Sequence, residues 1–123
     1  MKAIRIHEHG GPEKLQREEI PVPTPGRGEI RLRVEAAGLN FIDTYKRSGL
    51  YPVALPHTVG QEAAGVVTAV GTGVEEFRVG DRVASAAVVG ACAEEALVPA
   101  AQAVPVPPAV SSRLAAAVML QGL

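Results

Sequence analysis

Glycine and proline interrupt this sequence so often that long helices have little room in it. The 123 residues include 13 Gly and 10 Pro, and all but one of these lie within the first 110 positions. Both residue types bend or end helices and strands, so the segments between them are short. Short strands separated by turns are typical of a barrel or a sandwich. The sequence therefore predicts a mainly β fold.

Alternating apolar and polar residues mark the expected strands. Ile30, Leu32 and Val34 alternate with charged side chains, which predicts a half-buried strand with a charged outer face. Residues 21–28 contain three Pro and two Gly and are expected to form an extended linker. Further strands are expected at residues 3–6, 15–20, 62–74, 77–86, 93–100 and 103–107, with a turn at residues 80–81.

Charge and cysteine content exclude several classes of protein. With 12 Lys plus Arg against 13 Asp plus Glu, the formal net charge is −1, which indicates no nucleic-acid-binding surface. Cys92 is the single cysteine, so no disulfide can form within the chain, which fits a reducing compartment. No apolar run approaches the ~18 residues of a membrane span, and the N-terminus lacks the apolar stretch of a signal peptide. We therefore expect a cytoplasmic protein with no nucleic-acid and no membrane partner.

The pattern changes at residue 111, where apolar residues begin to recur at helical spacing. Ser111 or Ser112 can cap this helix. We expect residues 1–110 to form one domain and residues 111–123 to form the start of a linking helix. Natural domains more often end in a polar tail, so the sequence looks cut, and a homo-oligomer is one way to cover the apolar end. The apolar residues that need a packing partner there are Met119, Leu120 and Leu123.

Two motifs that suggest chemistry in other proteins are weak here. Gly71 and Gly73 lie in AVGTGVEEF, which lacks the third glycine of GxGxxG and falls between expected strands, so a glycine turn is favoured over a phosphate-binding loop. His7 and His9 would share one face of a strand and could chelate a metal. The one acidic residue at hand, Glu8, would point to the other face, so no metal site is expected.

The longest irregular segment, residues 38–60, carries three of the four aromatic residues and is expected to hold a short helical turn at residues 41–47. Neutral hydrogen-bonding groups beside aromatic rings suit a flat, uncharged ligand, because the rings stack and the polar groups fix orientation. A packed loop whose tyrosine hydroxyls are merely satisfied explains the same residues equally well. The candidate residues in and just after this segment are Asn40, Asp43, Tyr45, Tyr51, His57, Gln61 and Glu62.

Three segments carry a recognisable combination of motifs. They are GLNFIDTYKRSGLYP at residues 38–52, LPHTVGQEAAGVVTAVGTGV at residues 55–74 and FRVGDRV at residues 77–83. Together they resemble the N-terminal, GroES-like catalytic domain of the medium-chain dehydrogenase/reductase superfamily, most closely its zinc-free quinone oxidoreductase (zeta-crystallin-like) branch. The resemblance extends over essentially the whole chain. It implies a partly open β-barrel with short helical turns, and a C-terminal helix at residues 111–123 that leads into a Rossmann domain missing from the sequence.

The resemblance also bears on zinc. In zinc-dependent members a Cys stands at the position of Asn40 and a His at the position of Gln61. Amides are poor zinc ligands, and the two replacements together leave no tetrahedral set of nitrogen and sulfur ligands. We therefore expect no zinc.

The activity implied is NADPH-dependent reduction of a small quinone or activated enone. Carried over to this sequence, Asn40 fixes the nicotinamide end of the cofactor, Tyr45 and Tyr51 wall the flat acceptor, and Gln61 fills the space of the absent metal. Asp43 and Tyr51 are also expected beside the cofactor, although Asp43 can instead cap the helical turn. Without a Lewis acid, catalysis then depends on positioning and on hydrogen bonds to the developing oxyanion.

Two other functions stay open. The chain can be a non-catalytic GroES-like binding or assembly module, or part of a zinc-independent enoyl or carbonyl reductase of the same superfamily. The 123-residue chain alone is expected to be inactive, because it lacks a dinucleotide-binding fingerprint. Glu62 is expected to be a structural partner at a strand start, and Phe41 to anchor the loop that carries the tyrosines.

Overall fold

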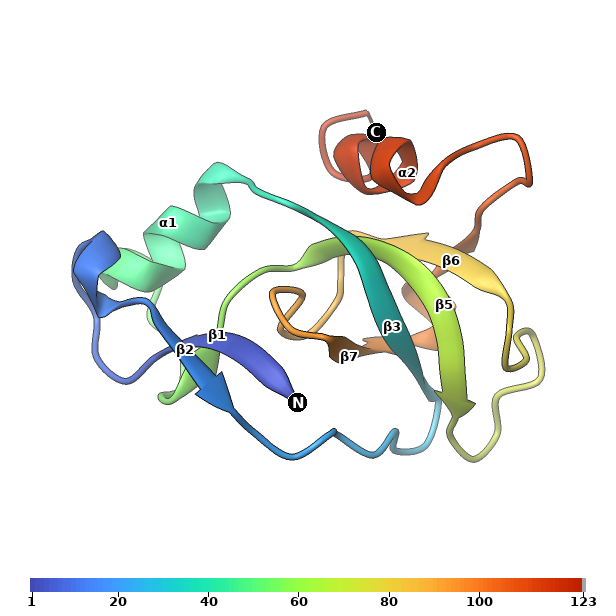
Figure 1. Ribbon diagram of the computed structural model, residues 1–123, viewed down its shortest axis with the longest axis horizontal. Helices are drawn as coiled ribbons and strands as arrows, with labels where there is room; N and C mark the ends of the chain where they lie inside the picture. The colour runs from blue at the N-terminus through green and yellow to red at the C-terminus, as the bar shows by residue number, and fades with distance from the viewer. Residues whose placement is uncertain (123) are drawn as a thin grey trace.

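Two antiparallel sheets dominate the chain, whose structure is a computed structural model that describes residues 1–122 (Figure 1). Three strands in the order β2-β1-β4 form the smaller sheet, and five in the order β7-β3-β5-β6-β8 form the larger one. Short 3₁₀ turns occur at Pro12–Lys14 and Ala100–Gln102. The strands and α-helices are β1 (Lys2–Ile6), β2 (Gln16–Glu19), β3 (Glu29–Gly38), α1 (Phe41–Ser48), β4 (His57–Thr58), β5 (Glu62–Val70), β6 (Arg82–Ser85), β7 (Glu95–Pro99), β8 (Val104–Pro105) and α2 (Ser112–Val118).

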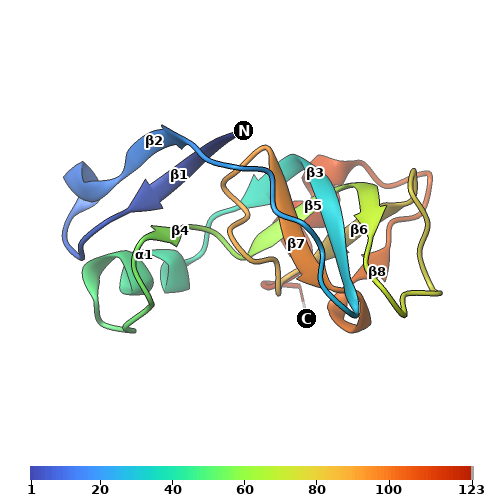
Figure 2. The same ribbon diagram turned by 90° about the horizontal axis from the view of Figure 1, so that it is seen from below.

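The two sheets occupy different ends of the molecule. Figure 2 shows β1, β2 and β4 with α1 at one end, and β3 with β5 to β8 at the other. Helix α2 packs over the larger sheet (Figure 1). Within residues 1–122 the strands do not close into a complete barrel. The expected mainly β fold, with an incompletely closed barrel and short helices, is confirmed.

The core depends on the alternation of side chains along β3 and β5. These strands pair antiparallel from Ile30 opposite Val70 to Gly38 opposite Glu62. Because successive side chains point to opposite faces, one ladder supplies two buried clusters. The larger cluster contains Ile30, Leu32, Ala63, Val67, Phe77, Val83, Val88 and Val98, and the smaller contains Ala64, Ala84, Val106, Ala115 and Ala116.

Helix α2 lies on the larger sheet through small side chains. The side chain of Ser111 caps it by accepting a hydrogen bond from the Leu114 N–H at 3.1 Å. Two buried alanines face β5 and β6, and Met119 packs against the same cluster. Met119 is therefore partly covered within the chain itself, while Leu123 lies outside the described residues. No helix in residues 1–122 is long and apolar enough to cross a membrane.

The segment at residues 77–86 is a strand over only part of the predicted length. The Asp81 side chain accepts a hydrogen bond from the Arg78 N–H at 2.9 Å and folds residues 78–81 into a turn. Phe77 turns into the core, where it is 7% exposed. These two features leave only Arg82–Ser85 extended enough to pair as β6.

Gly65→Ala is expected to destabilise the chain strongly. A Cβ at Gly65 would lie 2.0 Å from the Arg33 carbonyl oxygen on the paired strand, so β3 and β5 would have to move apart. Overpacking against backbone costs about 3 kcal/mol of unfolding free energy, measurable by urea denaturation. Gly26→Ala is the control, because its Cβ would meet only the mobile end of the Glu29 side chain. It should cost less than about 0.5 kcal/mol, and equal costs for the two variants would contradict the close approach.

Candidate functional site

The candidate site lies where β3 ends and β5 begins. Gly38, the last residue of β3, is paired with Glu62, the first residue of β5. Asn40 follows β3 and Gln61 precedes β5, so both emerge at the same end of the ladder. Helix α1 begins directly after Asn40, and Figure 1 shows this helix following β3. The antiparallel register thus brings together candidate residues that are well separated in the sequence.

Asp43 closes the first turn of α1. The Asn40 N–H donates to Asp43 Oδ2 at 2.9 Å, and the Asp43 N–H donates to the Asn40 carbonyl oxygen at 3.0 Å. Gly49 ends the helix at a φ of 92°, a left-handed conformation that suits glycine. The short helix expected at residues 41–47 is confirmed, and Asp43 fills the capping role that was one of the two considered for it. Its other oxygen, Oδ1, is buried and has no hydrogen-bond partner in residues 1–122.

The buried carboxylate of Glu62 binds the side chain of Asn40. Asn40 Nδ2 donates to Glu62 Oε1 at 2.8 Å, and Glu62 is only 1% exposed. The second oxygen, Glu62 Oε2, accepts a hydrogen bond from the Leu120 N–H at 2.8 Å. Asn40 Oδ1 accepts from Gln121 Nε2 at 3.1 Å. Glu62 is thus a structural partner at a strand start, as expected, while the contacts to Leu120 and Gln121 had no signal in the sequence pattern.

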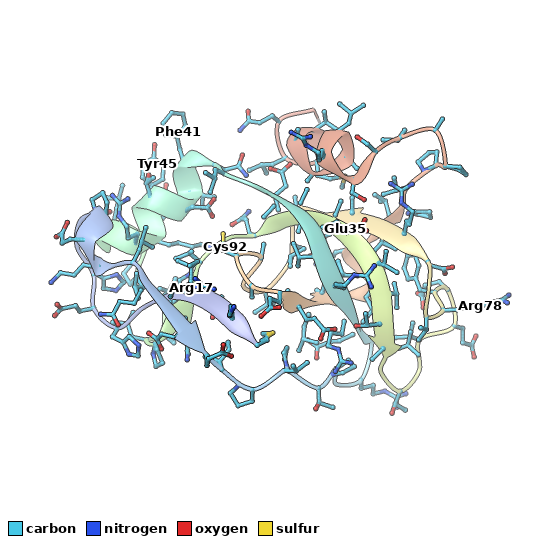
Figure 3. All side chains as sticks on the ribbon, viewed as in Figure 1. Arg17, Glu35, Phe41, Tyr45, Arg78 and Cys92 are labelled. Atoms are coloured by element: carbon cyan, nitrogen blue, oxygen red, sulfur yellow. The ribbon has the colours of Figure 1, made fainter. Side chains whose placement is uncertain are left out.

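The aromatic side chains form an exposed group on the outer face of α1. Tyr45 and Tyr51 meet edge to face with ring centroids 5.5 Å apart, and Phe41 stacks on Tyr45 at 6.5 Å. Figure 3 shows Phe41 and Tyr45 pointing away from the sheets. Phe41 is 76% exposed, so the expectation that it anchors the loop is wrong. Residues one turn apart share a helix face, and Phe41 therefore lies beside the exposed Tyr45.

Gln61 lies on the inner side of α1 and is held by Lys46. Gln61 Oε1 accepts a hydrogen bond from Lys46 Nζ at 3.1 Å, and Gln61 Nε2 donates to the Ala86 carbonyl oxygen at 3.3 Å. Both residues line a pocket of about 390 Å³ together with His57. Lys46 thus points inward, a direction that depends on the position of β5 relative to α1 and not on the local sequence.

Burial is the main cause of the shifted pKa values of two titratable groups in this region. Half-buried His57 has its pKa lowered, first by burial and then by the positive charge of Lys46. Burial also raises the pKa of the Cys92 thiol, with a smaller contribution from the Asp43 carboxylate. The neutral forms of both groups are favoured, so Cys92 behaves as a thiol and not as an activated nucleophile.

The predicted site residues form three groups. Asn40 and Asp43 are joined by the helix cap, Tyr45 and Tyr51 by the contact of their rings, and Gln61 is bonded to Lys46. No hydrogen bond within residues 1–122 links either tyrosine side chain to Gln61. Two pockets flank the first group. One of about 360 Å³ is lined by Asn40, Glu62, Arg113 and Gln121, and one of about 470 Å³ by Asn40, Phe41, Thr44 and Gln121.

The histidines considered for metal binding are separated. β1 ends at Ile6, so His7 and His9 do not share a strand face, which corrects the sequence interpretation. His7 Nε2 pairs with Glu18, and His9 Nδ1 lies 3.1 Å from the Lys46 carbonyl oxygen. In the described part of the chain, no group of three or more His, Cys, Asp or Glu side chains is arranged to hold a metal ion.

Residues 26–108 match the alcohol dehydrogenase GroES-like domain, and the chain belongs to that family. Quinone oxidoreductase of Salmonella typhimurium is 51% identical over 98% of the chain, and quinone oxidoreductase 1 of Escherichia coli is 47% identical over 98%. The structure of E. coli quinone oxidoreductase complexed with NADPH matches 99% of the chain with a TM-score of 0.96 at 45% identity. The resemblance to the GroES-like domain of quinone oxidoreductases is confirmed.

These relatives are much longer than the chain. It covers 37% of each of the two bacterial quinone oxidoreductases and 38% of the NADPH-complexed structure. A 2-haloacrylate reductase from a Burkholderia species is also similar, with 46% identity over 85% of the chain and 33% of the reductase. The family therefore includes close relatives that are named for more than one kind of substrate.

His57→Gln is expected to reduce the acid sensitivity of the fold. The folded-state pKa of His57 lies below its ordinary value of 6.5, so the unfolded chain takes up this proton first as the pH falls. The contribution of His57 to stability is therefore complete above pH 6.5 and is lost as the pH falls toward the folded pKa. Urea unfolding at about pH 7.5 and about pH 5.5 measures the loss, which should be smaller in the variant.

Lys46→Met provides a comparison for His57→Gln. It removes the nearby positive charge but leaves His57 half-buried, and burial is the larger cause of the lowered pKa. This variant should therefore keep most of the pH dependence. A His57→Gln variant as sensitive to acid as the native chain would show that His57 is not responsible.

Proposed function

We propose that the chain is the catalytic-domain portion of an NADPH-dependent quinone oxidoreductase, which transfers a hydride from NADPH to a small quinone or activated enone without zinc. The observation that carries this proposal is the match of nearly the whole chain to quinone oxidoreductases at 45–51% identity, one of them complexed with NADPH. The same proposal accounts for the neutral hydrogen-bonding groups at one end of the β3–β5 ladder and for the aromatic rings exposed on the adjacent helix α1.

The residues at this end of the ladder suit the nicotinamide part of NADPH. Asn40 Oδ1 already accepts a hydrogen bond from the primary amide of Gln121, the same kind of donor that a nicotinamide carboxamide offers. Buried Asp43 Oδ1 has capacity for a further donor. When bound, NADPH supplies the hydride. Asn40 would hold the cofactor by its oxygen, Asp43 would support it by capping the turn that carries Asn40, and Tyr51 would lie on the exposed side of the cofactor.

The remaining candidates suit a flat acceptor. Tyr45 and Tyr51 are both exposed and their rings lie edge to face, which suits the stacking and orientation of a quinone. A tyrosine hydroxyl would donate to the oxygen on which negative charge develops. Gln61 stands at the position of a zinc-ligating histidine. It accepts a hydrogen bond from Lys46 and so keeps the Lys46 ammonium group in place. Rate enhancement would come from positioning and these hydrogen bonds.

Reduction of an activated alkene, the second substrate class of this proposal, is supported by one specific observation. The Burkholderia 2-haloacrylate reductase shares 46% identity with the chain over 85% of its length. When an activated alkene or a quinone accepts a hydride, negative charge develops on an oxygen of a flat, conjugated group, so one flat pocket with a hydrogen-bond donor suits both. Rates with a small quinone and with an activated enone, measured side by side, distinguish the two substrate classes.

Asn40→Ala and Tyr51→Phe test the site in the longer enzyme that carries this sequence. Loss of the Asn40 oxygen should raise the KM for NADPH about tenfold, the effect of one strong hydrogen bond. Loss of the Tyr51 hydroxyl should lower kcat with a small quinone by at least about tenfold. Val79→Ala, on an exposed loop residue away from the site, is the control, and the 123-residue chain alone should show negligible turnover. Unchanged kinetics in both site variants would refute the assignment.

Metal analysis of the purified protein tests the absence of zinc. The expected zinc content after dialysis against a chelator is well below one equivalent, because both amides are poor ligands and are engaged in hydrogen bonds. Asn40→Cys combined with Gln61→His, which restores the ligand types of the zinc-dependent members, is the comparison and should bind more zinc. One tightly held equivalent in the unmodified protein would overturn this part of the proposal.

A further inference from the structure

Among the described residues, Glu62 is the one charged side chain that is almost completely buried, at 1% exposure. Each of its carboxylate oxygens accepts one hydrogen bond, Oε1 from Asn40 Nδ2 and Oε2 from the Leu120 N–H, both at 2.8 Å. Both oxygens are thus acceptors, and each neighbour that bonds to them presents a donor. Asn40 is one of these neighbours, so its side chain must turn the NH₂ group toward Glu62.

The carboxylate determines which end of the Asn40 amide faces outward. An asparagine amide has a donating NH₂ group on one side and an accepting oxygen on the other. With Nδ2 committed to Glu62, Oδ1 must point the other way. It meets a donor there, Gln121 Nε2 at 3.1 Å, at the boundary of the pockets of about 360 and 470 Å³. Glu62 therefore makes Asn40 an acceptor toward these pockets.

The space for this carboxylate depends on a glycine in the facing strand. A Cβ at Gly38 would lie 2.1 Å from Glu62 Oε1 and 3.0 Å from the Ala116 carbonyl oxygen of α2. Glu62 is thus enclosed by β3 and α2 and by the turn that carries Leu120. Its position is set by three separate parts of the chain and does not depend on a mobile loop.

We infer that Glu62 is a positioning residue of the candidate site. It orients the Asn40 amide so that the site selects ligands that offer an N–H or O–H donor, such as a carboxamide or a sugar hydroxyl. Through Leu120 it also links this orientation to the turn after α2. The identity of the ligand as NADPH rests on the proposed function, whereas the orientation of Asn40 rests only on the contacts of Glu62.

An exchange of the two side-chain types tests the orientation. In Glu62→Gln the new amide can still accept from Leu120 but must donate to residue 40, so Asn40 has to turn over. In the ¹⁵N-labelled chain, the Asn40 side-chain NH₂ resonances should shift and exchange with water about tenfold faster, as loss of a hydrogen bond to a charged group implies.

Urea unfolding gives a second test. Asn40→Asp alone places two carboxylates next to each other and should lower the urea midpoint most. The double variant, which combines Asn40→Asp with Glu62→Gln, again sets one donor opposite one acceptor. Its urea midpoint should therefore lie well above that of Asn40→Asp.

Glu35→Gln is the matched control. It removes the same charge, and Glu35 also contacts α2 by accepting a hydrogen bond from Ser112 Oγ at 2.6 Å, but it does not touch Asn40. The Asn40 resonances should stay in place in this variant. Unmoved resonances in Glu62→Gln, or a double variant no more stable than the sum of its single changes predicts, would overturn the inference.

Kinetics in the longer enzyme connect the orientation to the ligand. Glu62→Gln should raise the KM for NADPH about tenfold with a smaller change in kcat, and the double variant should recover part of the loss because it again presents an acceptor oxygen. An unchanged KM despite shifted Asn40 resonances would overturn the positioning role. If the unmodified enzyme does not oxidise NADPH, the proposed function fails, while the resonances still decide how Asn40 is oriented.

Discussion

The pairing of β3 with β5 is the constraint on which the rest of the structure depends. At Gly65 the two backbones approach so closely that even one added carbon would lie 2.0 Å from a carbonyl oxygen. Each face of this ladder is covered by a different buried cluster, one of larger aliphatic side chains and one of alanines beneath α2. Because each face of the ladder packs closely against its cluster, small and branched side chains are favoured on both faces. This explains why the core needs only one buried aromatic residue, Phe77.

The same ladder also fixes the positions of the candidate site residues. Asn40 lies two residues beyond the last pair of the ladder, Gly38 and Glu62, and Gln61 lies one residue before it. Side chains so close to paired backbone have little freedom to drift, which is what catalysis by positioning requires. A long loop could carry the same residue types but would have to be ordered by other contacts. Here the carboxylate of Glu62 and the cap from Asp43 complete that ordering.

The parts of the fold that follow from local chemistry could be predicted from the sequence. Alternation at Ile30 and Leu32 identified strand β3, the glycines and prolines predicted short elements, and Ser111 or Ser112 predicted the start of α2. Contacts between distant segments could not be predicted in this way. Nothing in the local pattern indicates that Gln121 reaches Asn40, because this contact depends on α2 folding back over the sheet. The candidate residues were found by type, but their division into separate groups became visible only with the register.

The prediction for Phe41 failed for a reason that bears on function. A surface helix normally turns its apolar face inward, yet α1 directs Asp43 and Lys46 inward and exposes Phe41 and Tyr45. Leaving a phenylalanine in water forgoes roughly 2 kcal/mol of burial, and an unpaired buried oxygen such as Asp43 Oδ1 adds a further cost. A stable fold tolerates such a reversed helix where the exposed groups serve a ligand, since functional sites are where local rules are most often broken. The reversal of α1 therefore supports a ligand-binding role for its outer face independently of any comparison with relatives.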